Sequence, residues 1–425
     1  MLMKIKQEQN NRLSFFEIAL SVLLCFTSMR VFLPYSGTGI LGIVPFIGAL
    51  ILVFGLSALV KNVFSVKDFV FYLCVLIWIG WFSVCLKAVN FVAYDIKMII
   101  CIGVVFICAV TVIKNCNVKC IVPMVILVCV FSTITIAISM PIISENEMAV
   151  REYAAGITDY SRSGLGGYEF VYCLSMFCPC LLLLFKVFRG WQKVLIGVVI
   201  AASIVYSASC GLFITFIINI SSISLYLIVK VKNKKHRKLL IYFIVAVVIM
   251  FMLLGSQLLI QSLTYINENI DNSALNMKIS DMIRSLSGEE EEYGTFSSRA
   301  ERYGWSFATF MKSPVLGGFV IGETKISGSH STLLDYMAIT GALGFGIFFW
   351  MFVTLYKTAA NQLKNELSKS VLWIVFGMFM MTAFFKGVSF ASIFWVVLVV
   401  VPLTVRMCDS MLSRMEGSFL ESFAD

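Results

Sequence analysis

Residues 211–262 decide the fold of this chain. They read GLFITFIINISSISLYLIV (211–229), KVKNKKHRK (230–238) and LLIYFIVAVVIMFMLLGSQLLIQS (239–262). Each apolar run is long enough to cross a bilayer, which takes about 20 residues of helix. The basic run between them is typical of a cytoplasmic loop, because Lys and Arg are retained on that side of a membrane. Backbone polar groups must be satisfied within the bilayer, and runs without period-two alternation therefore predict helices.

The same pattern recurs along all 425 residues. Of these residues 60% are hydrophobic and only 13% are charged, whereas a soluble domain has about a quarter of its residues charged. We therefore predict an all-α, polytopic membrane bundle of about twelve transmembrane helices. The predicted spans are residues 15–33, 39–60, 68–86, 95–113, 119–140, 168–187, 193–209, 211–229, 239–262, 331–355, 371–385 and 388–405.

The distribution of Lys and Arg predicts that both termini lie on the cytoplasmic side. Placing the N-terminus inside puts the basic residues of successive short loops on one side throughout. The net charge of +9 is thus a topology signal and does not indicate nucleic-acid binding. The first run, 15–33, lacks a small-residue cleavage site and is interpreted as a span. Most of the 13 cysteines lie inside apolar runs, where they act as small hydrophobes and indicate no disulfide framework.

Three regions follow from this topology. Residues 1–262 would hold transmembrane helices 1–9, residues 263–330 an extracytoplasmic (periplasmic) loop with helical segments, and residues 331–425 helices 10–12 with a cytoplasmic tail. A second long outside segment covers 141–167. Function tends to concentrate in long ordered loops on a rigid scaffold. No internal repeat is evident, which weighs against a transporter built from inverted halves.

Only two histidines occur in the chain. His236 lies within the basic run and is interpreted as a solvated loop residue. His330 ends the long outside loop where the tenth span begins. An imidazole there titrates near neutral pH and can act as a general base. The alternative is an interfacial histidine that only forms hydrogen bonds.

The surroundings of His330 form a motif. The chain reads SRAERYGW at 298–305, KSPVLGG at 312–318 and GSHS at 328–331, and nine residues separate Ser331 from GALG at 341–344. This arrangement resembles the superfamily of O-antigen ligases and of O-antigen and capsule polysaccharide polymerases. Its members carry an arginine-rich segment, a Ser-Pro-Gly-Gly turn, and a histidine with a small polar residue nine positions before a GxxG.

The resemblance implies an enzyme of the bacterial plasma (inner) membrane. It would be a glycosyltransferase that joins polyprenyl-diphosphate-linked oligosaccharide repeat units, of O-antigen or capsule, at the outer face. Undecaprenyl diphosphate is the carrier that the resemblance implies, and a separate protein could regulate chain length. A ligase that transfers glycan to lipid A core remains open, and so does a flippase or transporter. The sequence departs from the family pattern at Ser209-Cys210-Gly211, where members often have an arginine.

Arginine suits a diphosphate ligand, because its planar fork pairs phosphate oxygens bidentately and stays charged. Arg299 and Arg302 are spaced i, i+3 and would share one helix face. Arg162, in the other outside segment, could add a third arm, although a solvated or snorkelling arginine is the alternative. His330 would deprotonate the acceptor hydroxyl in a single displacement that inverts the anomeric centre.

Three further residues are secondary candidates. Asp335 could orient His330 or bind sugar hydroxyls, or it could form an ordinary interhelical hydrogen bond. Tyr303 could stack on a sugar ring, although aromatic residues are common at membrane surfaces. Lys386 could face the same cavity, or it could snorkel. Residues Glu289–Glu292 are interpreted as a solvated loop, and since no DxD pair accompanies the motif, we expect neither a metal nor a cofactor.

Overall fold

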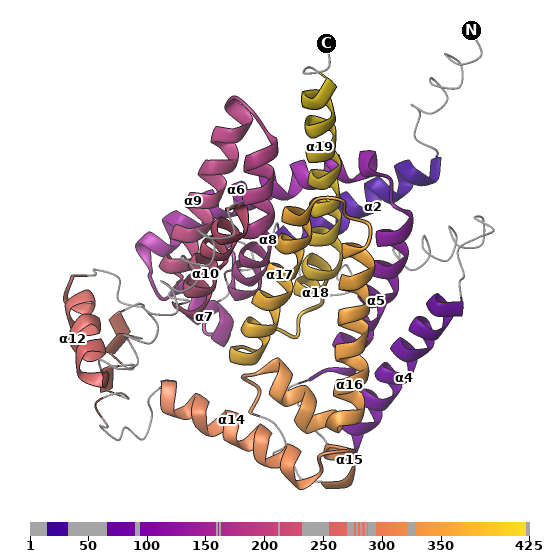
Figure 1. Ribbon diagram of the computed structural model, residues 1–425. Helices are drawn as coiled ribbons and strands as arrows, with labels where there is room; N and C mark the ends of the chain where they lie inside the picture. The colour runs from indigo at the N-terminus through magenta and orange to yellow at the C-terminus, as the bar shows by residue number, and fades with distance from the viewer. Residues whose placement is uncertain are drawn as a thin grey trace.

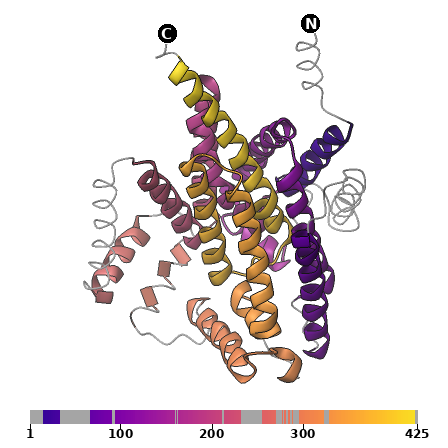
Figure 2. The ribbon, with the colours of Figure 1, turned by 45° about the vertical axis from the view of Figure 1, so that its right-hand side comes forward.

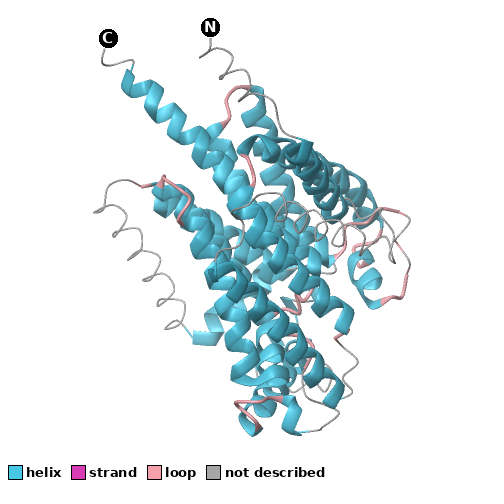
Figure 3. Ribbon diagram, turned by 90° about the vertical axis from the view of Figure 1, so that its right-hand side faces the viewer, coloured by secondary structure: helices cyan, strands magenta, loops and turns pink. Residues whose placement is uncertain are grey.

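The computed structural model contains helices throughout the part of the chain that it describes (Figure 1). The described residues are 15–32, 66–89, 94–158, 160, 163–210, 213–231, 255–269, 276–277, 279–280, 283–284, 287, 295–321 and 328–421. Within these ranges there is no strand, and Figure 3 shows the described loops as short connections between helices. The predicted all-α class is therefore confirmed.

Eight helical segments of the described residues are long and apolar enough to cross a membrane. These segments are α4 (Val66–Val89), α5 (Ile96–Asn115), α6 (Val118–Glu145), α8 (Tyr168–Val187), α9 (Trp191–Ser209), α16 (Thr332–Ala360), α17 (Glu366–Phe385) and the run of α18 (Ala391–Trp395), η2 (Val396–Val400) and α19 (Val401–Glu421). This is the architecture of a multi-pass membrane protein.

Two more helices stand where spans were predicted. Helix α2 (Phe15–Phe32) matches the predicted span 15–33, and α10 (Phe213–Lys230) matches 211–229. The predicted span 39–60 lies outside the described residues. So does 239–262, except for its last residues, which begin α12 (Gly255–Glu268).

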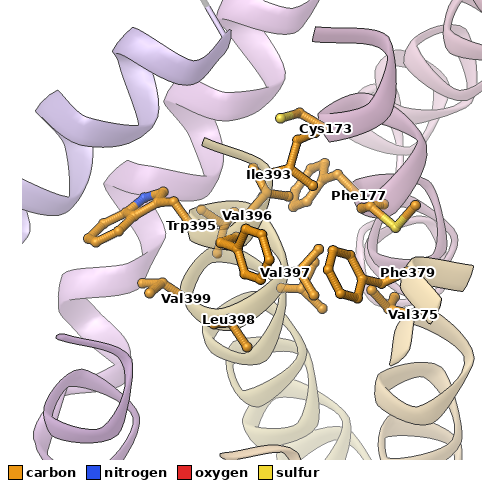
Figure 4. Packing of buried hydrophobic residues seen from close by; sticks show 14 of the residues in the cluster. Cys173, Phe177, Val375, Phe379, Ile393, Trp395, Val396, Val397, Leu398 and Val399 are labelled. Carbon is orange, nitrogen blue, oxygen red and sulfur yellow. The ribbon is translucent and has the colours of Figure 1, made fainter. Parts of the chain in front are cut away.

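The bundle core forms around the run α18–η2–α19 (Figure 4). Every residue of the π-helical turn Val396–Val400 is fully buried. Such a turn disturbs the regular backbone ladder, and here the Tyr356 hydroxyl donates to the Val397 carbonyl at 3.0 Å. Phe352 and Phe379 stack beside this run with ring centroids 4.8 Å apart. Because lipid tails are as apolar as these side chains, close packing is what holds the helices together.

Polar side chains at one end of the bundle are matched to structural partners. Lys114 forms an ion pair with Asp68. Asp409 accepts hydrogen bonds of 2.9 and 2.8 Å from two backbone N–H groups just before α17. Arg406 donates to the Ile113 carbonyl at 2.9 Å. These contacts tie α4, α5, α17 and α19 together at this end.

Helices α14 (Thr295–Lys312) and α15 (Gly318–Ile321) lie at the other end of the bundle, away from the C-terminal part of α19 (Figure 1). Figure 2 shows the same separation from a second direction. Helix α14 packs on α16, and α15 packs on α4. This end therefore carries the helix on which Arg299 and Arg302 lie.

Helix α16 is broken at Gly341, and the turn that follows α14 packs against this break. Gly341 has φ 65° and ψ −174°, a conformation essentially restricted to glycine. The break frees the N–H groups of Ala342 and Leu343, which donate to the carbonyls of Pro314 at 2.8 Å and Val315 at 3.3 Å. A Cβ on Gly317 would lie 2.4 Å from the Gly341 nitrogen. This close crossing of two backbones explains why glycines occur in both parts of the motif.

Candidate active site

The local backbone presents His330 at the start of α16. Ser331 is the N-cap, and its side-chain oxygen accepts from the Leu334 N–H at 3.2 Å. Ser329, on the other side of His330, has φ 60°, in the left-handed region that non-glycine residues rarely adopt. Gly328 packs directly on α14, because a Cβ there would lie 2.3 Å from the Arg302 carbonyl oxygen. The segment 328–331, here called the histidine segment, thus packs directly against α14, the helix that carries Arg299 and Arg302.

The hydrogen bonds of the His330 ring define its tautomer. Nδ1 lies 2.9 Å from the Ser329 carbonyl oxygen, which can only accept, so Nδ1 carries the proton. Nε2 lies 3.2 Å from Nη1 of Arg302, which can only donate, so Nε2 offers its lone pair. His330 is therefore a neutral imidazole whose basic nitrogen faces an arginine.

The electrostatic surroundings favour the neutral form of His330. Burial lowers the pKa of this imidazole from its ordinary value, and the charges of Arg302, Arg299 and Lys386 lower it further. The hydrogen bond to Ser329 acts in the opposite direction but does not reverse the shift. At neutral pH this ring is therefore uncharged.

Arg299 and Arg302 both lie on α14, one turn apart, as their spacing predicted. Each side chain is partly buried. Tyr303 follows on the same helix, and its hydroxyl donates to the Phe385 carbonyl at 2.8 Å. Burial raises the pKa of Tyr303, while the Arg299 charge acts against that rise. Tyr303 thus fastens the arginine helix to the end of α17, and its hydroxyl is already engaged.

Hydrogen bonds between the turn after α17 and the start of α16 hold Lys386 near His330. Its carbonyl accepts from the Thr332 N–H at 3.1 Å and from the Thr332 hydroxyl at 3.3 Å. The Thr332 hydroxyl oxygen in turn accepts from the Val388 N–H at 2.7 Å. The turn after α17 is therefore tied to the start of α16, and the charge of Lys386 acts on the imidazole together with those of Arg302 and Arg299.

Asp335 lies beneath this group and is 0% exposed. Its carboxylate accepts from the Tyr94 hydroxyl at 2.7 Å and from the Ser306 hydroxyl at 2.7 Å. Ser306 also accepts from the Gly328 N–H at 2.9 Å. The carboxylate thus connects α14, α16 and the segment before α5. This is the alternative role considered for Asp335, an interhelical hydrogen bond. Its complete burial does not suit contact with a sugar.

Tyr94 and Ser306 were not among the predicted site residues. Ser306 stands four positions after Arg302, so the helical period would have placed it on the same face. Tyr94 adjoins the predicted outer end of span 95–113, but nothing in the sequence pairs it with residue 335. Arg162 lies outside the described residues, as do Glu289–Glu292 and His236.

The described part of the chain contains no group of three or more His, Cys, Asp or Glu side chains placed to hold a metal ion. No protein-family model matches the sequence, and no curated protein matches it with significant similarity. The interpretation of the site therefore depends on its geometry and on the motif around His330.

Proposed function

We propose that the protein is a polysaccharide polymerase that joins polyprenyl-diphosphate-linked oligosaccharide repeat units at a membrane surface. One observation carries the proposal: the basic Nε2 of a neutral His330 lies 3.2 Å from Arg302, with Arg299 and Lys386 also near enough to lower the pKa of the ring. A base beside several phosphate-binding cations is what glycosyl transfer from a lipid diphosphate requires.

The reaction follows from these roles. His330 Nε2 takes the proton of an acceptor sugar hydroxyl, and the hydroxyl oxygen attacks the anomeric carbon of the donor. The bond from that carbon to the diphosphate oxygen breaks, and polyprenyl diphosphate leaves with the electron pair. Arg299 and Arg302 bind the diphosphate and stabilise the charge that develops on it. A single displacement inverts the anomeric centre.

Arg302 has a second role in this scheme. Without substrate its guanidinium occupies the Nε2 lone pair, so the base is blocked. A diphosphate offers arginine a doubly charged, bidentate partner that a neutral ring nitrogen cannot match. Donor binding would draw Arg302 away and free His330 for the acceptor. The scheme predicts ordered binding, with the donor first.

The membrane orientation belongs to the same proposal: twelve spans, both termini in the cytoplasm of a bacterial cell, and the site at the outer face of the plasma membrane. Contacts between segment ends support the alternation. Lys114 meets Asp68, and both lie near predicted inside ends. Tyr94 meets Asp335, and both lie near predicted outside ends. An outside site would receive sugars on a lipid carrier and not as nucleotide sugars.

The glycan of a deletion strain tests this function. A polymerase predicts that carrier-linked single repeat units accumulate when the gene is deleted. Long carrier-linked chains would instead indicate a ligase, and single units retained on the cytoplasmic side would indicate a flippase. Complementation with His330→Ala should fail, whereas His236→Ala, which changes the other histidine, should restore the polymer.

A further inference from the structure

The Ser329 carbonyl determines which nitrogen of His330 can act as the base. Its oxygen lies 2.9 Å from Nδ1, which therefore carries the ring proton. In the proposed reaction Arg302 moves from Nε2 to the diphosphate, and the Ser329 bond is then what keeps the proton on Nδ1. The tautomer of a histidine is set by such hydrogen bonds. If the carbonyl turned away, the proton could move to Nε2, and that nitrogen would no longer be basic.

The backbone of Ser329 is held in an uncommon conformation. Its φ is 60°, a left-handed value that persists at a non-glycine residue only where the surrounding structure enforces it. The direction of the Ser329 carbonyl follows from this conformation. A Cβ on Gly387 would lie 3.3 Å from the Ser329 oxygen, so the carbonyl also packs closely on the turn after α17. The tautomer of His330 thus depends on the contacts that keep Ser329 in place.

Helix α14 fixes the residue before Ser329 through Ser306. The Gly328 N–H donates to the Ser306 oxygen at 2.9 Å, and the Ser306 hydroxyl donates to Asp335 at 2.7 Å. The same hydroxyl lies 3.4 Å from the Arg302 carbonyl oxygen, which is the weaker acceptor. Because Ser306 has a single proton, the carboxylate keeps that proton directed away from Gly328 and leaves a lone pair for its N–H group.

Tyr94 fixes the other oxygen of Asp335, to which its hydroxyl donates at 2.7 Å. Burial and the charge of Asp335 raise the pKa of Tyr94, so the hydroxyl stays protonated and remains a donor. The Tyr94 ring packs edge-on against Phe82 and Tyr336, with ring centroids 6.4 and 6.0 Å apart. A buried carboxylate requires such hydrogen bonds. A chain of hydrogen bonds therefore runs from the segment before α5 to the backbone beside His330.

We propose that Tyr94 and Asp335 are positioning residues that keep the ring proton of His330 on Nδ1. They act through Ser306 and the backbone of the histidine segment, and not by contact with a substrate. The interhelical carboxylate thereby takes part in the chemistry, because it reserves Nε2 for the acceptor hydroxyl. The role of His330 as the base rests on the proposed function, but its tautomer can be measured without turnover.

Nitrogen NMR of the full chain, labelled at histidine, tests the proposal. The two ring nitrogens give separate signals that report which of them is protonated. Arg302→Ala serves as the background, because it removes the guanidinium that lies against Nε2. In this background, at mildly alkaline pH, we expect the proton of His330 on Nδ1. Adding Asp335→Asn should distribute the proton over both nitrogens, since an amide oxygen and an amide NH₂ cannot both accept hydroxyl protons. Adding Tyr94→Phe should act in the same direction, by less.

The control in the same background is Tyr72→Phe, which removes a hydroxyl that hydrogen-bonds with Thr111 at 2.8 Å, near Asp68. It should leave the tautomer of His330 unchanged. If the Asp335→Asn protein is not monodisperse, Tyr94→Phe carries the test alone. A proton that stays on Nδ1 in every variant, or an equal change in Tyr72→Phe, would overturn the proposal.

Turnover supplies a second readout. Without the background change, Tyr94→Phe should lower kcat several-fold and leave KM for the lipid-linked donor unchanged, because Arg299 and Arg302 are untouched. A raised KM with an unchanged kcat would contradict the positioning role. If the wild-type protein formed no polymer, the proposed function would fail, but the tautomer measured by NMR would still decide whether Tyr94 acts on His330.

Discussion

The two ends of the bundle use charge differently. At one end Lys114 pairs with Asp68, and the Asp409 carboxylate accepts from two backbone N–H groups. At the other end Arg299, Arg302 and Lys386 all act on the imidazole of His330, and their charges lower its pKa. The charged groups at the first end thus stabilise contacts between helices, whereas at the second end three cations act on one neutral base.

The difference indicates what each end is for. Pairs and caps of the first kind hold helices in place and need no ligand. Several cations near one neutral ring favour the binding of an anion, because a negative charge offsets their mutual repulsion. The Asp335 carboxylate, which lies close to this group, is already engaged by Tyr94 and Ser306. Changes at the two ends should therefore affect different properties of the protein.

Removing the arginine fork should have the largest effect. Arg302→Ala should lower kcat/KM for polymer formation by a factor on the order of 10²–10³, since it removes a donor to the leaving diphosphate. Arg302→Lys should also be impaired, because a point charge does not replace a bidentate fork. Arg414→Ala, an exposed arginine on α19, should leave turnover almost unchanged. An equal fall in kcat/KM in Arg302→Ala and Arg414→Ala would contradict the different roles of charge at the two ends.

The break in α16 should be the most sensitive point for stability. Gly341→Ala places a Cβ 2.2 Å from the Val315 carbonyl in a conformation that costs a non-glycine residue about 1–3 kcal/mol. We expect a clear fall in the thermal midpoint of the purified protein. The control is Gly346→Ala on the same helix, where a Cβ would meet nothing within 4 Å. Similar midpoints for the two variants would mean that the crossing is not rigid.

The hydrogen bonds beneath the site should contribute less. Ser306→Ala leaves the Gly328 N–H without its partner and removes one donor from Asp335. A buried group left unsatisfied costs about 1–3 kcal/mol, so thermal unfolding should shift modestly. Turnover should fall as well, because Gly328 positions the histidine segment on α14. The control is Ser370→Ala, at an exposed hydroxyl on α17. If Ser306→Ala had the same thermal midpoint and turnover as the wild type, Ser306 would not position the histidine segment.

The smallest predicted change is in the titration of His330. Its pKa lies below the ordinary histidine value, so activity that needs the neutral base should rise with pH below that value and level off near neutrality. Arg302→Gln removes a charge that disfavours the imidazolium, so the pKa of His330 should rise. Because the chain has two histidines, NMR of histidine-labelled protein can follow both. An unchanged His330 titration in Arg302→Gln would contradict the proximity of the two side chains.

The sequence alone predicted much of this architecture. Apolar runs of about 20 residues identify spans because the bilayer imposes their length, and eight of them recur as helices able to cross a membrane. The i, i+3 spacing predicted that Arg299 and Arg302 would share one helix face, and both lie on α14. Local periodicity cannot specify partners distant in the chain, so the contact of Tyr94 with Asp335, 241 positions apart, was not predicted.

The break in α16 could not be predicted from the hydropathy of the sequence either. A window average treats residues 331–355 as one continuous span, because the glycines of GALG scarcely change its mean. The reason for the break lies in the turn at 313–317, which supplies the carbonyls that the broken helix needs. The motif contained both halves of this arrangement, but only the fold brings them into contact.

The most direct test of the central claim is an assay of the purified protein in proteoliposomes with a defined polyprenyl-diphosphate-linked repeat unit. The wild-type protein should produce a ladder of carrier-linked polymer and release polyprenyl diphosphate. His330→Ala, purified as folded and monodisperse protein, should produce neither, and His236→Ala should match the wild type. A ladder from His330→Ala equal to that of the wild type would contradict the assignment of His330 as the base.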